Sequence, residues 1–224
     1  MTSTITVTDF YRPQPRGDGL PFVTVSYAQS LDGCLASHDH RALALSGHAS
    51  MTLTHAIRAS HDAILVGVQT VLSDDPMLTV RWVEGENPQP VVLDSRLRFP
   101  PSARLLTHPR GVWVATVTPP PPTLAPALTV LQTDRNPNGQ VDLLHVLQQL
   151  GERGIRSVMV EGGATVIASF LQARLVNRVI VTLTPRYFGG VGIAHTLRTA
   201  TPIALPHPQC FALGEDFILW SDLA

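Results

Sequence analysis

The stretch Val158-Met159-Val160-Glu161-Gly162-Gly163-Ala164-Thr165 points most directly to the fold of this chain. A short apolar run ends in an acid and two glycines, and an amphipathic segment follows over residues 166–175. A strand that runs through glycines into a helix presents free backbone N–H groups at the positive end of the helix dipole. This arrangement suits a phosphate or pyrophosphate. Glycines after a strand are also common in plain turns, so both interpretations remain open for the motif by itself.

Elsewhere, short apolar runs alternate with segments of helical periodicity. The pattern predicts strands over residues 22–27, 62–68, 91–93, 112–117, 156–161 and 179–183, and helices over 50–60, 143–151 and 166–175. Continuous apolar runs are typical of parallel strands that are buried on both faces. Residues 211–220 predict a hairpin or a bulged edge strand. We expect a three-layer α/β fold: a mainly parallel central sheet, helices on both faces and an antiparallel hairpin at the C-terminal edge.

Prolines and glycines suggest how the chain is divided. The first 21 residues contain Pro13, Pro15, Gly17, Gly19 and Pro21, which predict a flexible N-terminal arm over 1–21. The proline-rich segment 118–126 is predicted to be a surface connection and not a domain boundary. Residues 22–224 are therefore expected to form a single domain.

Composition excludes several classes of function. The 224 residues are 44% hydrophobic with a formal net charge of -1, which gives no long-range attraction for nucleic acid or an anionic membrane. No apolar run approaches the roughly 20 residues that span a bilayer, and no signal peptide is visible, so a cytoplasmic location is expected. Cys34 and Cys210 lack metal or disulfide spacing. The histidines between His38 and His61 lack a ligand pattern, and no metal site is predicted.

The densest polar cluster, Thr70–Arg81, follows the predicted buried strand over residues 62–68. Ligands of open α/β sheets collect beyond the carboxyl ends of strands, which is where this segment is expected. Asp74 and Asp75 are candidates for ligand contacts, or they cap a turn before Pro76. Arg58 precedes the same strand, and together with Arg81 it could bind a phosphate through two hydrogen bonds. The alternative for each arginine is a surface salt bridge.

A second polar turn, Asp94-Ser95-Arg96-Leu97-Arg98, follows another predicted strand. An NAD site usually places a carboxylate on the adenosine ribose, whereas the extra phosphate of NADP needs neutral hydrogen-bonding groups or cations. Ser95 and the two arginines favour NADP, although Asp94 lies in the same turn.

Four motifs together resemble a known family. In chain order they are Ser30-Leu31-Asp32-Gly33, the segment Thr70–Arg81, Val92-Leu93-Asp94-Ser95-Arg96 and Val160–Thr165. Their order is similar to that in the reductase domain of bacterial riboflavin biosynthesis, the RibD C-terminal domain family, which has a dihydrofolate reductase-like fold. The resemblance extends from Phe22 to the C-terminus, and the segment Thr70–Arg81 is its most specific part.

The resemblance implies an NADPH-dependent reductase, usually a homodimer, that converts a ribosylaminopyrimidine 5′-phosphate to the ribitylamino form. By position, the expected NADPH contacts are Thr70, Asp74, Ser95, Gly162, Gly163, Ala164 and Thr165. The expected substrate contacts are Arg58, Leu78, Arg81 and Glu161. Glu161, and after it Asp32, are the candidate catalytic groups for polarising the sugar.

Three departures from the family pattern leave the substrate open. Ser26 stands where many members have Lys or Asn, and Ala42 and Ala44 stand where many have Ser-x-Trp. The zinc signature of the companion deaminase is absent, so the resemblance implies either a separate deaminase as partner or the stand-alone branch of the family, which reduces the 2,5-diamino-6-ribosylaminopyrimidinone 5′-phosphate. The alternatives are a reductase of a different small carbonyl or pterin substrate, and a non-catalytic nucleotide-binding module.

Overall fold

The computed structural model describes residues 10–38 and 43–223. Its central sheet has nine strands in the order β10-β11-β8-β1-β7-β3-β4-β5-β6. The strands are β1 (Phe22–Ser30), β3 (Ala63–Gly67), β4 (Gln89–Leu93), β5 (Val112–Thr116), β6 (Leu128–Gln132), β7 (Ser157–Val160), β8 (Arg178–Thr184), β10 (Gln209–Leu213) and β11 (Asp216–Asp222). All pairings are parallel except those of β11 with β8 and β10. The predicted mainly parallel sheet with an antiparallel C-terminal hairpin is confirmed.

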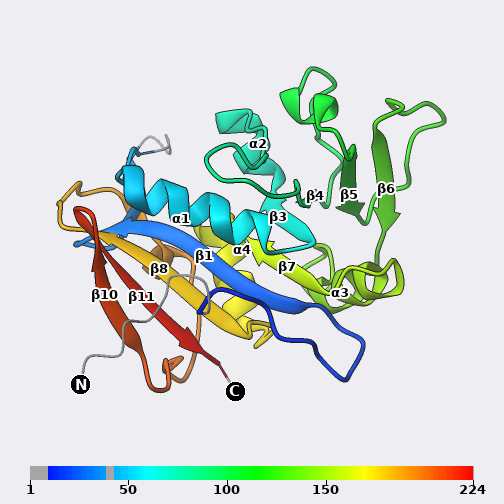
Figure 1. The fold of residues 1–224 in the computed structure, drawn as a ribbon. Helices are drawn as coiled ribbons and strands as arrows, with labels where there is room; N and C mark the ends of the chain where they lie inside the picture. The colour runs from blue at the N-terminus through cyan, green and yellow to red at the C-terminus, as the bar shows by residue number, and fades with distance from the viewer. Residues whose placement is uncertain (1–9, 39–42, 224) are drawn as a thin grey trace.

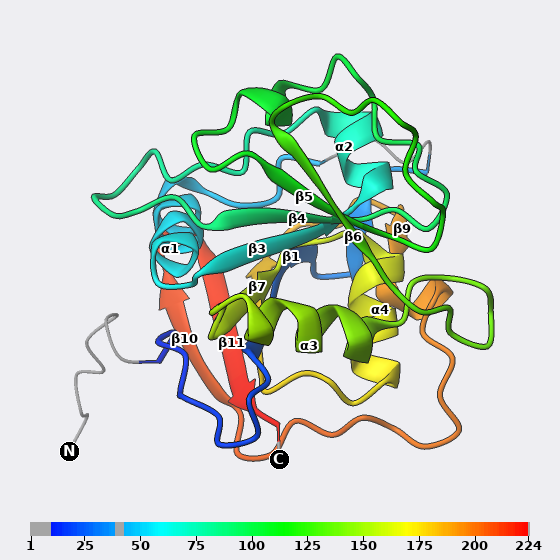
Figure 2. The ribbon, with the colours of Figure 1, turned by 90° about the vertical axis from the view of Figure 1, so that its right-hand side faces the viewer.

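In the described part of the chain, four α-helices cover this sheet: α1 (His48–Ala59), α2 (Val68–Asp74), α3 (Leu143–Glu152) and α4 (Ala164–Gln172). Figures 1 and 2 show α1 and α2 on one face and α3 and α4 on the other. Strand β3 explains the layers, because its side chains alternate between faces. Ile64 and Val66 pack in one cluster with α2, whereas Ala63 and Leu65 pack in another with α3 and α4. The predicted three-layer arrangement is thus confirmed.

The structure adds elements that the sequence pattern did not predict. Residues 68–74, taken as the end of a strand and the start of a polar loop, form helix α2 directly after β3. No side chain caps this helix and its first turn has no acid, so the usual start signals are missing. Edge strand β6 was also missed, as was a two-stranded sheet of β2 (Cys34–Ala36) and β9 (Val191–Gly192). Two 3₁₀ turns, η1 (Arg104–Thr107) and η2 (Ile193–His195), complete the described elements.

The N-terminal arm, expected to be flexible over residues 1–21, makes contacts with the rest of the chain in its described part. Phe10 is buried in a cluster with Leu53 and Ile57 of α1. The Arg178 guanidinium donates to the Arg12 carbonyl at 3.0 Å. The aromatic ring buried in the core and the bond from Arg178 attach this part of the arm to the rest of the chain, although it is rich in prolines and glycines. Residues 1–9 lie outside the described part.

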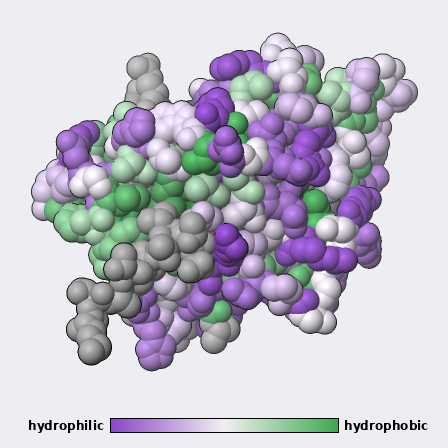
Figure 3. Space-filling model, viewed as in Figure 1, coloured by the Kyte–Doolittle hydropathy of each residue, from purple (hydrophilic) through white to green (hydrophobic). Residues whose placement is uncertain are grey.

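Apolar surface gathers at one end of the molecule. Figure 3 shows it at the left, over the ends of β1 and β8. The exposed side chains of Leu31, Tyr187 and Phe188 belong to the loops that leave these two strands. Within the described ranges, no helix has the length and apolar character that a membrane crossing requires.

Candidate active site

The parallel strands β7, β3 and β4 are neighbours, and their carboxyl ends lie along one side of the sheet, here called the carboxyl edge. Glu161 and Gly162 follow β7, α2 follows β3, and Asp94 and Ser95 follow β4. Adjacent strands lie about 4.8 Å apart, so the three ends span roughly 10 Å. The structure therefore brings most of the predicted cofactor residues, from three separate parts of the sequence, to one edge.

The start of helix α4 is packed tightly against this edge. A Cβ atom on Gly162 would lie 2.9 Å from Cβ of Val166, and one on Gly67 would lie 2.8 Å from Cγ2 of the same valine. Only glycine permits this approach, because real Cβ atoms do not come so close. The two glycines thus hold the first turn of α4 against the ends of β7 and β3.

Gly163 differs from Gly162 in its surroundings. It is the exposed N-cap of α4, it supplies no side-chain cap, and a Cβ atom placed there would meet no heavy atom within 4 Å. The first N–H groups of a helix have no partner within the helix, and here the neighbouring space is open. Ala164 and the exposed Thr165 follow in the first turn. The open space beside these N–H groups leaves room for the anion that the sequence predicts at this position, which stays a prediction.

Arg58 and Glu161 form a two-bond ion pair at this edge. Nε of Arg58 donates to Oε2 of Glu161 at 2.8 Å, and Nη2 donates to Oε1 at 2.5 Å. The arginine is buried, whereas the glutamate side chain is 27% exposed. Burial opposes the charge on Arg58, but Glu161 outweighs it and raises the pKa of the guanidinium. The two bonds from Arg58 leave lone pairs of the Glu161 carboxyl group for a ligand hydroxyl.

Arg81 lies close to this pair but has different partners. Nη1 of Arg58 donates to the carbonyl of Thr79 at 3.2 Å, and Nη1 of Arg81 donates to the hydroxyl of the same threonine at 3.1 Å. The two arginines predicted to bind one phosphate are thus brought together around Thr79. Because Glu161 occupies most of the Arg58 fork, the exposed Arg81 is the better placed of the two for an anion.

The other residues of the Thr70–Arg81 segment divide between exposed and buried positions. Thr70 and the exposed Asp74 lie on α2. Asp75 ends this helix with φ at 42°, and its carboxylate accepts the N–H of Arg104, 29 residues away, at 2.8 Å, so its side chain holds a distant segment and not the turn before Pro76. Leu78 also has a positive φ and packs in the core with α2. Its side chain is buried, which leaves its main chain for the predicted substrate contact.

The turn after β4 contains Asp94 and Ser95, the two candidates for contacting the adenosine end of a cofactor, and their surroundings differ. Asp94 is buried, and its carboxylate accepts the N–H of Phe99 at 2.8 Å. The Ser95 hydroxyl accepts the N–H of Val141 at 3.0 Å and keeps its own proton for a ligand. Arg96 and Arg98 are exposed. Nε of Arg98 lies 3.7 Å from Oδ1 of Asp94, so Ser95 and Arg96 are the groups of this turn that remain for a ligand.

Asp32 joins two loops at the ends of β1 and β8. Its carboxylate accepts the Ser30 hydroxyl, the Gly189 N–H at 2.7 Å and the Phe188 N–H at 3.3 Å. The hydroxyl of Ser30, followed by the N–H of Gly189, holds the pKa of Asp32 well below its usual range. Such a carboxylate has no proton to give, so this arrangement favours a structural role for Asp32 over proton donation.

The sequence pattern did not single out His55 and Trp82, which contact the same region. His55 is fully buried on α1, and its Nδ1 accepts the Arg81 N–H at 3.1 Å. Trp82 stacks on His55 and on His48, with ring centroids 5.6 and 5.0 Å apart. The spacing of the two histidines, seven residues apart, gave no signal in the sequence because the predicted helix over 50–60 does not include His48, where α1 begins.

The buried histidines predict how stability depends on pH. Burial is the main cause that lowers the pKa of both His55 and His61 to about 4 from the ordinary 6.5. Below pH 6.5 the unfolded chain takes up protons on these side chains, whereas the folded chain does not until about pH 4. The free energy of unfolding is therefore expected to fall over this window as the pH is lowered, measured by urea denaturation. His61→Gln should reduce the slope, and an unchanged slope would contradict this assignment.

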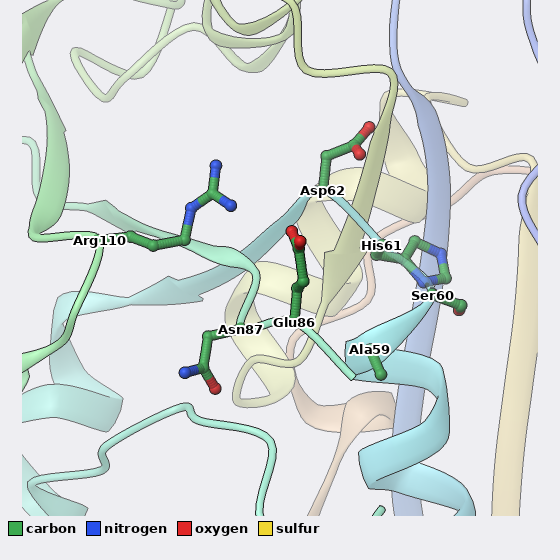
Figure 4. Close-up of a pocket in the computed structure, with 7 residues that line it drawn as sticks. All are labelled: Ala59, Ser60, His61, Asp62, Glu86, Asn87 and Arg110. Carbon is green, nitrogen blue, oxygen red and sulfur yellow. Dashed lines mark hydrogen bonds between the residues drawn. The ribbon is translucent and has the colours of Figure 1, made fainter. Parts of the chain in front are cut away.

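Two cavities lie away from the carboxyl edge. One cavity, of about 210 Å³, lies at the amino ends of the parallel strands. It is lined by Ala59, Ser60, His61, Asp62, Glu86, Asn87 and Arg110. Figure 4 shows Glu86 and Arg110 extending toward Asp62, while Asn87 points away. Oδ2 of Asp62 accepts backbone N–H groups of Arg156 and Ser157, which fixes the start of β7. The other cavity lies along β10 and β11. Among the described residues, no acid, histidine and cysteine cluster could hold a metal.

The mainly parallel sheet carries a glycine-rich helix start and an ion-paired glutamate at the carboxyl ends of its strands. Comparisons with known proteins agree with this arrangement. The model of the RibD C-terminal domain matches residues 21–219, and the chain belongs to that family.

Two reductases of the same name are similar to this chain over most of its length. The chain is 36% identical to the 2,5-diamino-6-ribosylamino-4(3H)-pyrimidinone 5′-phosphate reductase of Methanothermobacter thermautotrophicus, over 89% of this chain and 96% of that one. The reductase of the same name from Archaeoglobus fulgidus is 35% identical, over 76% of this chain and 83% of that one.

Solved structures confirm the fold. The riboflavin biosynthesis reductase Rib7 of Saccharomyces cerevisiae superimposes with a TM-score of 0.80 at 29% identity, and the match covers 96% of both chains. A deaminase and 5-amino-6-(5-phosphoribosylamino)uracil reductase of Thermotoga maritima superimposes with a TM-score of 0.77 at 27% identity, over 92% of this chain and 58% of that one. The predicted dihydrofolate reductase-like fold is that of these reductases.

Proposed function

We propose that this protein is an NADPH-dependent reductase of riboflavin biosynthesis that converts a ribosylaminopyrimidine 5′-phosphate to its ribitylamino form. The observation that carries the proposal is the meeting, at one edge of the sheet, of the open start of α4 with the Arg58–Glu161 pair and Arg81. One part suits a dinucleotide and the other suits a sugar phosphate. The 2,5-diamino compound is the first substrate to test, because two relatives that this chain matches over most of their length carry that name.

Different residues would bind NADPH and the substrate. Gly163, Ala164 and Thr165 would hold the pyrophosphate of NADPH, and Thr70, Asp74 and Ser95 would hold the rest of the dinucleotide. NADPH, when bound, supplies the hydride that is added to C1 of the sugar. Arg81 would bind the substrate phosphate. Glu161, fixed by Arg58, would accept hydrogen bonds from sugar hydroxyls and so hold C1 in line for transfer.

The proton has its own place in the proposal. As the hydride is added to C1, the bond from C1 to the ring oxygen opens, and that oxygen takes one proton. Glu161 would polarise and orient the sugar, and a water or a substrate group would deliver the proton. The assay is consumption of NADPH with each pathway intermediate. Absence of turnover with both intermediates would remove the proposal.

The departures from the family pattern support testing a second candidate function. Ser26 is buried in β1 and Ala44 is exposed, while Ala42 lies outside the described residues. A smaller side chain at position 44 leaves room for a changed substrate, so a screen of carbonyl and pterin compounds by NADPH absorbance is the second assay. Binding of NADPH without turnover of any compound would favour a non-catalytic module instead. A homodimer and a separate deaminase partner stay part of the proposal.

The two glycines at the start of α4 give a matched test of cofactor binding. Gly163→Ala places its Cβ in open space and is expected to change stability by less than about 1 kcal/mol. The methyl group occupies the proposed pyrophosphate position, so the Kd for NADPH should rise about tenfold or more, measured by calorimetry. Gly162→Ala, which overlaps Val166, should instead cost about 1–3 kcal/mol of stability in urea denaturation. Unchanged NADPH affinity in Gly163→Ala would rule out this binding position.

A further inference from the structure

Trp82 lies between two histidine rings of α1. The planes of His48 and Trp82 are inclined by 28°, and those of His55 and Trp82 by 16°, so both pairs are stacked. Residues seven apart on a helix are two turns, or about 10 Å, apart along its axis. That gap accommodates one aromatic ring. The main chain immediately after Arg81 is thus attached to α1 by a stack of three rings.

The main chain at Arg81 itself is attached through His55. Nδ1 of this histidine accepts the Arg81 N–H, so the proton of the neutral ring is on Nε2. Nε2 is buried and has no hydrogen-bond partner. Leaving a buried donor unpaired costs free energy, and an apolar side chain could pack at this buried position without that cost. The contact that accounts for this residue is the one to Arg81.

Two further bonds hold the preceding residues. The carbonyl of Thr79 accepts from Arg58, and the N–H of Val80 donates to the Asn87 side chain at 2.7 Å. The segment 79–82 is therefore fixed along its length, although the Arg81 side chain is exposed. A long, flexible side chain on a fixed main chain loses less freedom on binding an anion than one on a mobile loop.

Building on the proposed function, we propose that His55 and Trp82 are positioning residues, which act on the substrate phosphate only through Arg81. They keep the Arg81 main chain against α1, so that the guanidinium stays beside the Arg58–Glu161 pair. Neither residue contacts the substrate itself. Burial together with the charges of Arg58 and Arg81 lowers the pKa of His55, which keeps its ring neutral and able to accept the Arg81 N–H at neutral pH.

The test compares variants that keep or remove each contact. His55→Leu removes the acceptor, whereas His55→Asn keeps an acceptor oxygen the same number of bonds from Cα as Nδ1. Trp82→Ala removes the stack at a position that is 43% exposed, so the fold is retained, and Trp82→Phe keeps an aromatic ring. Binding of ribose 5-phosphate and of NADPH is measured by calorimetry on the full chain, and exchange of the Arg81 amide is measured by NMR.

We expect His55→Leu and Trp82→Ala each to raise the Kd for ribose 5-phosphate about tenfold, with NADPH affinity unchanged. His55→Asn and Trp82→Phe should restore most of the affinity, and the Arg81 amide should exchange faster in His55→Leu. In an Arg81→Ala background the same changes should have no further effect, because their route to the phosphate is gone.

Three results would overturn the positioning role: equal losses in the Arg81→Ala background, unchanged ribose 5-phosphate affinity in both His55→Leu and Trp82→Ala, or no binding of ribose 5-phosphate by the wild type. The proposed function has a separate readout. Ribose 5-phosphate binding without turnover of either pathway intermediate would remove the reductase assignment, while the comparison of variants would still decide the role of His55 and Trp82.

Discussion

Replacing Glu161 by Gln is expected to lower kcat/KM at least about 100-fold, because the charged acceptor for the sugar hydroxyls and the fixed partner of Arg58 are lost together. Arg58 is buried, so its charge is left without a full counterion. Removing one member of a buried pair costs about 3–5 kcal/mol, and the partial exposure of Glu161 reduces this to about 1–3 kcal/mol. Steady-state kinetics and urea denaturation measure the two effects separately.

A double variant distinguishes a catalytic role from a structural one. Arg58→Met combined with Glu161→Leu replaces the ion pair by apolar side chains of similar volume, which is often neutral for stability. The double variant is expected to regain most of the stability that Glu161→Gln loses and to remain inactive. Recovery of activity along with stability would show that the pair only supports the fold.

Arg81→Ala is expected to raise the KM for the phosphorylated substrate about 100-fold, since a charge-assisted, two-bond contact to phosphate is lost. Stability should change by less than about 0.5 kcal/mol, because the side chain is exposed. Arg81→Lys keeps the charge but not the fork and should fall between the two. Initial-rate kinetics at saturating NADPH give these values.

The control for Arg81 is the affinity for NADPH. The proposed pyrophosphate position lies at the start of α4, whereas the Arg81 main chain is attached to α1, so NADPH binding should be unaffected. An equal loss of affinity for cofactor and substrate would mean that Arg81 serves the dinucleotide. Arg135→Ala, at another arginine, provides a matched loss of charge.

Much of the fold could be predicted because its strands are buried on both faces. The run Ala63–Gly67 is apolar without interruption and is fully buried in β3, as the sequence pattern predicts. Helix α2 could not be predicted in this way, because it follows β3 without a turn and has no capping side chain. Edge strand β6 has a single buried residue, Leu131, and polar residues at Thr129 and Gln132, so it lacks the apolar run that reveals a central strand.

The candidate site was predictable only in part, because its contacts join distant segments. Arg58 and Glu161 are 103 residues apart and meet because β7 lies next to β3, an order that apolar patterns do not contain. Asp32 was predicted as a candidate catalytic group, but its contacts with Phe188 and Gly189 depend on the neighbouring ends of β1 and β8. Resemblance to a family assigned positions where the physical pattern alone left alternatives.

The central claim is that a dinucleotide site and a sugar phosphate site meet at the carboxyl ends of β7, β3 and β4. A crystal structure with NADP and ribose 5-phosphate bound together tests it most directly. We expect the pyrophosphate at the N–H groups of Gly163–Thr165 and the sugar phosphate on Arg81, with the sugar hydroxyls facing Glu161. A sugar phosphate bound instead at the opposite edge of the sheet, in the cavity beside Asp62 and Arg110, would contradict it.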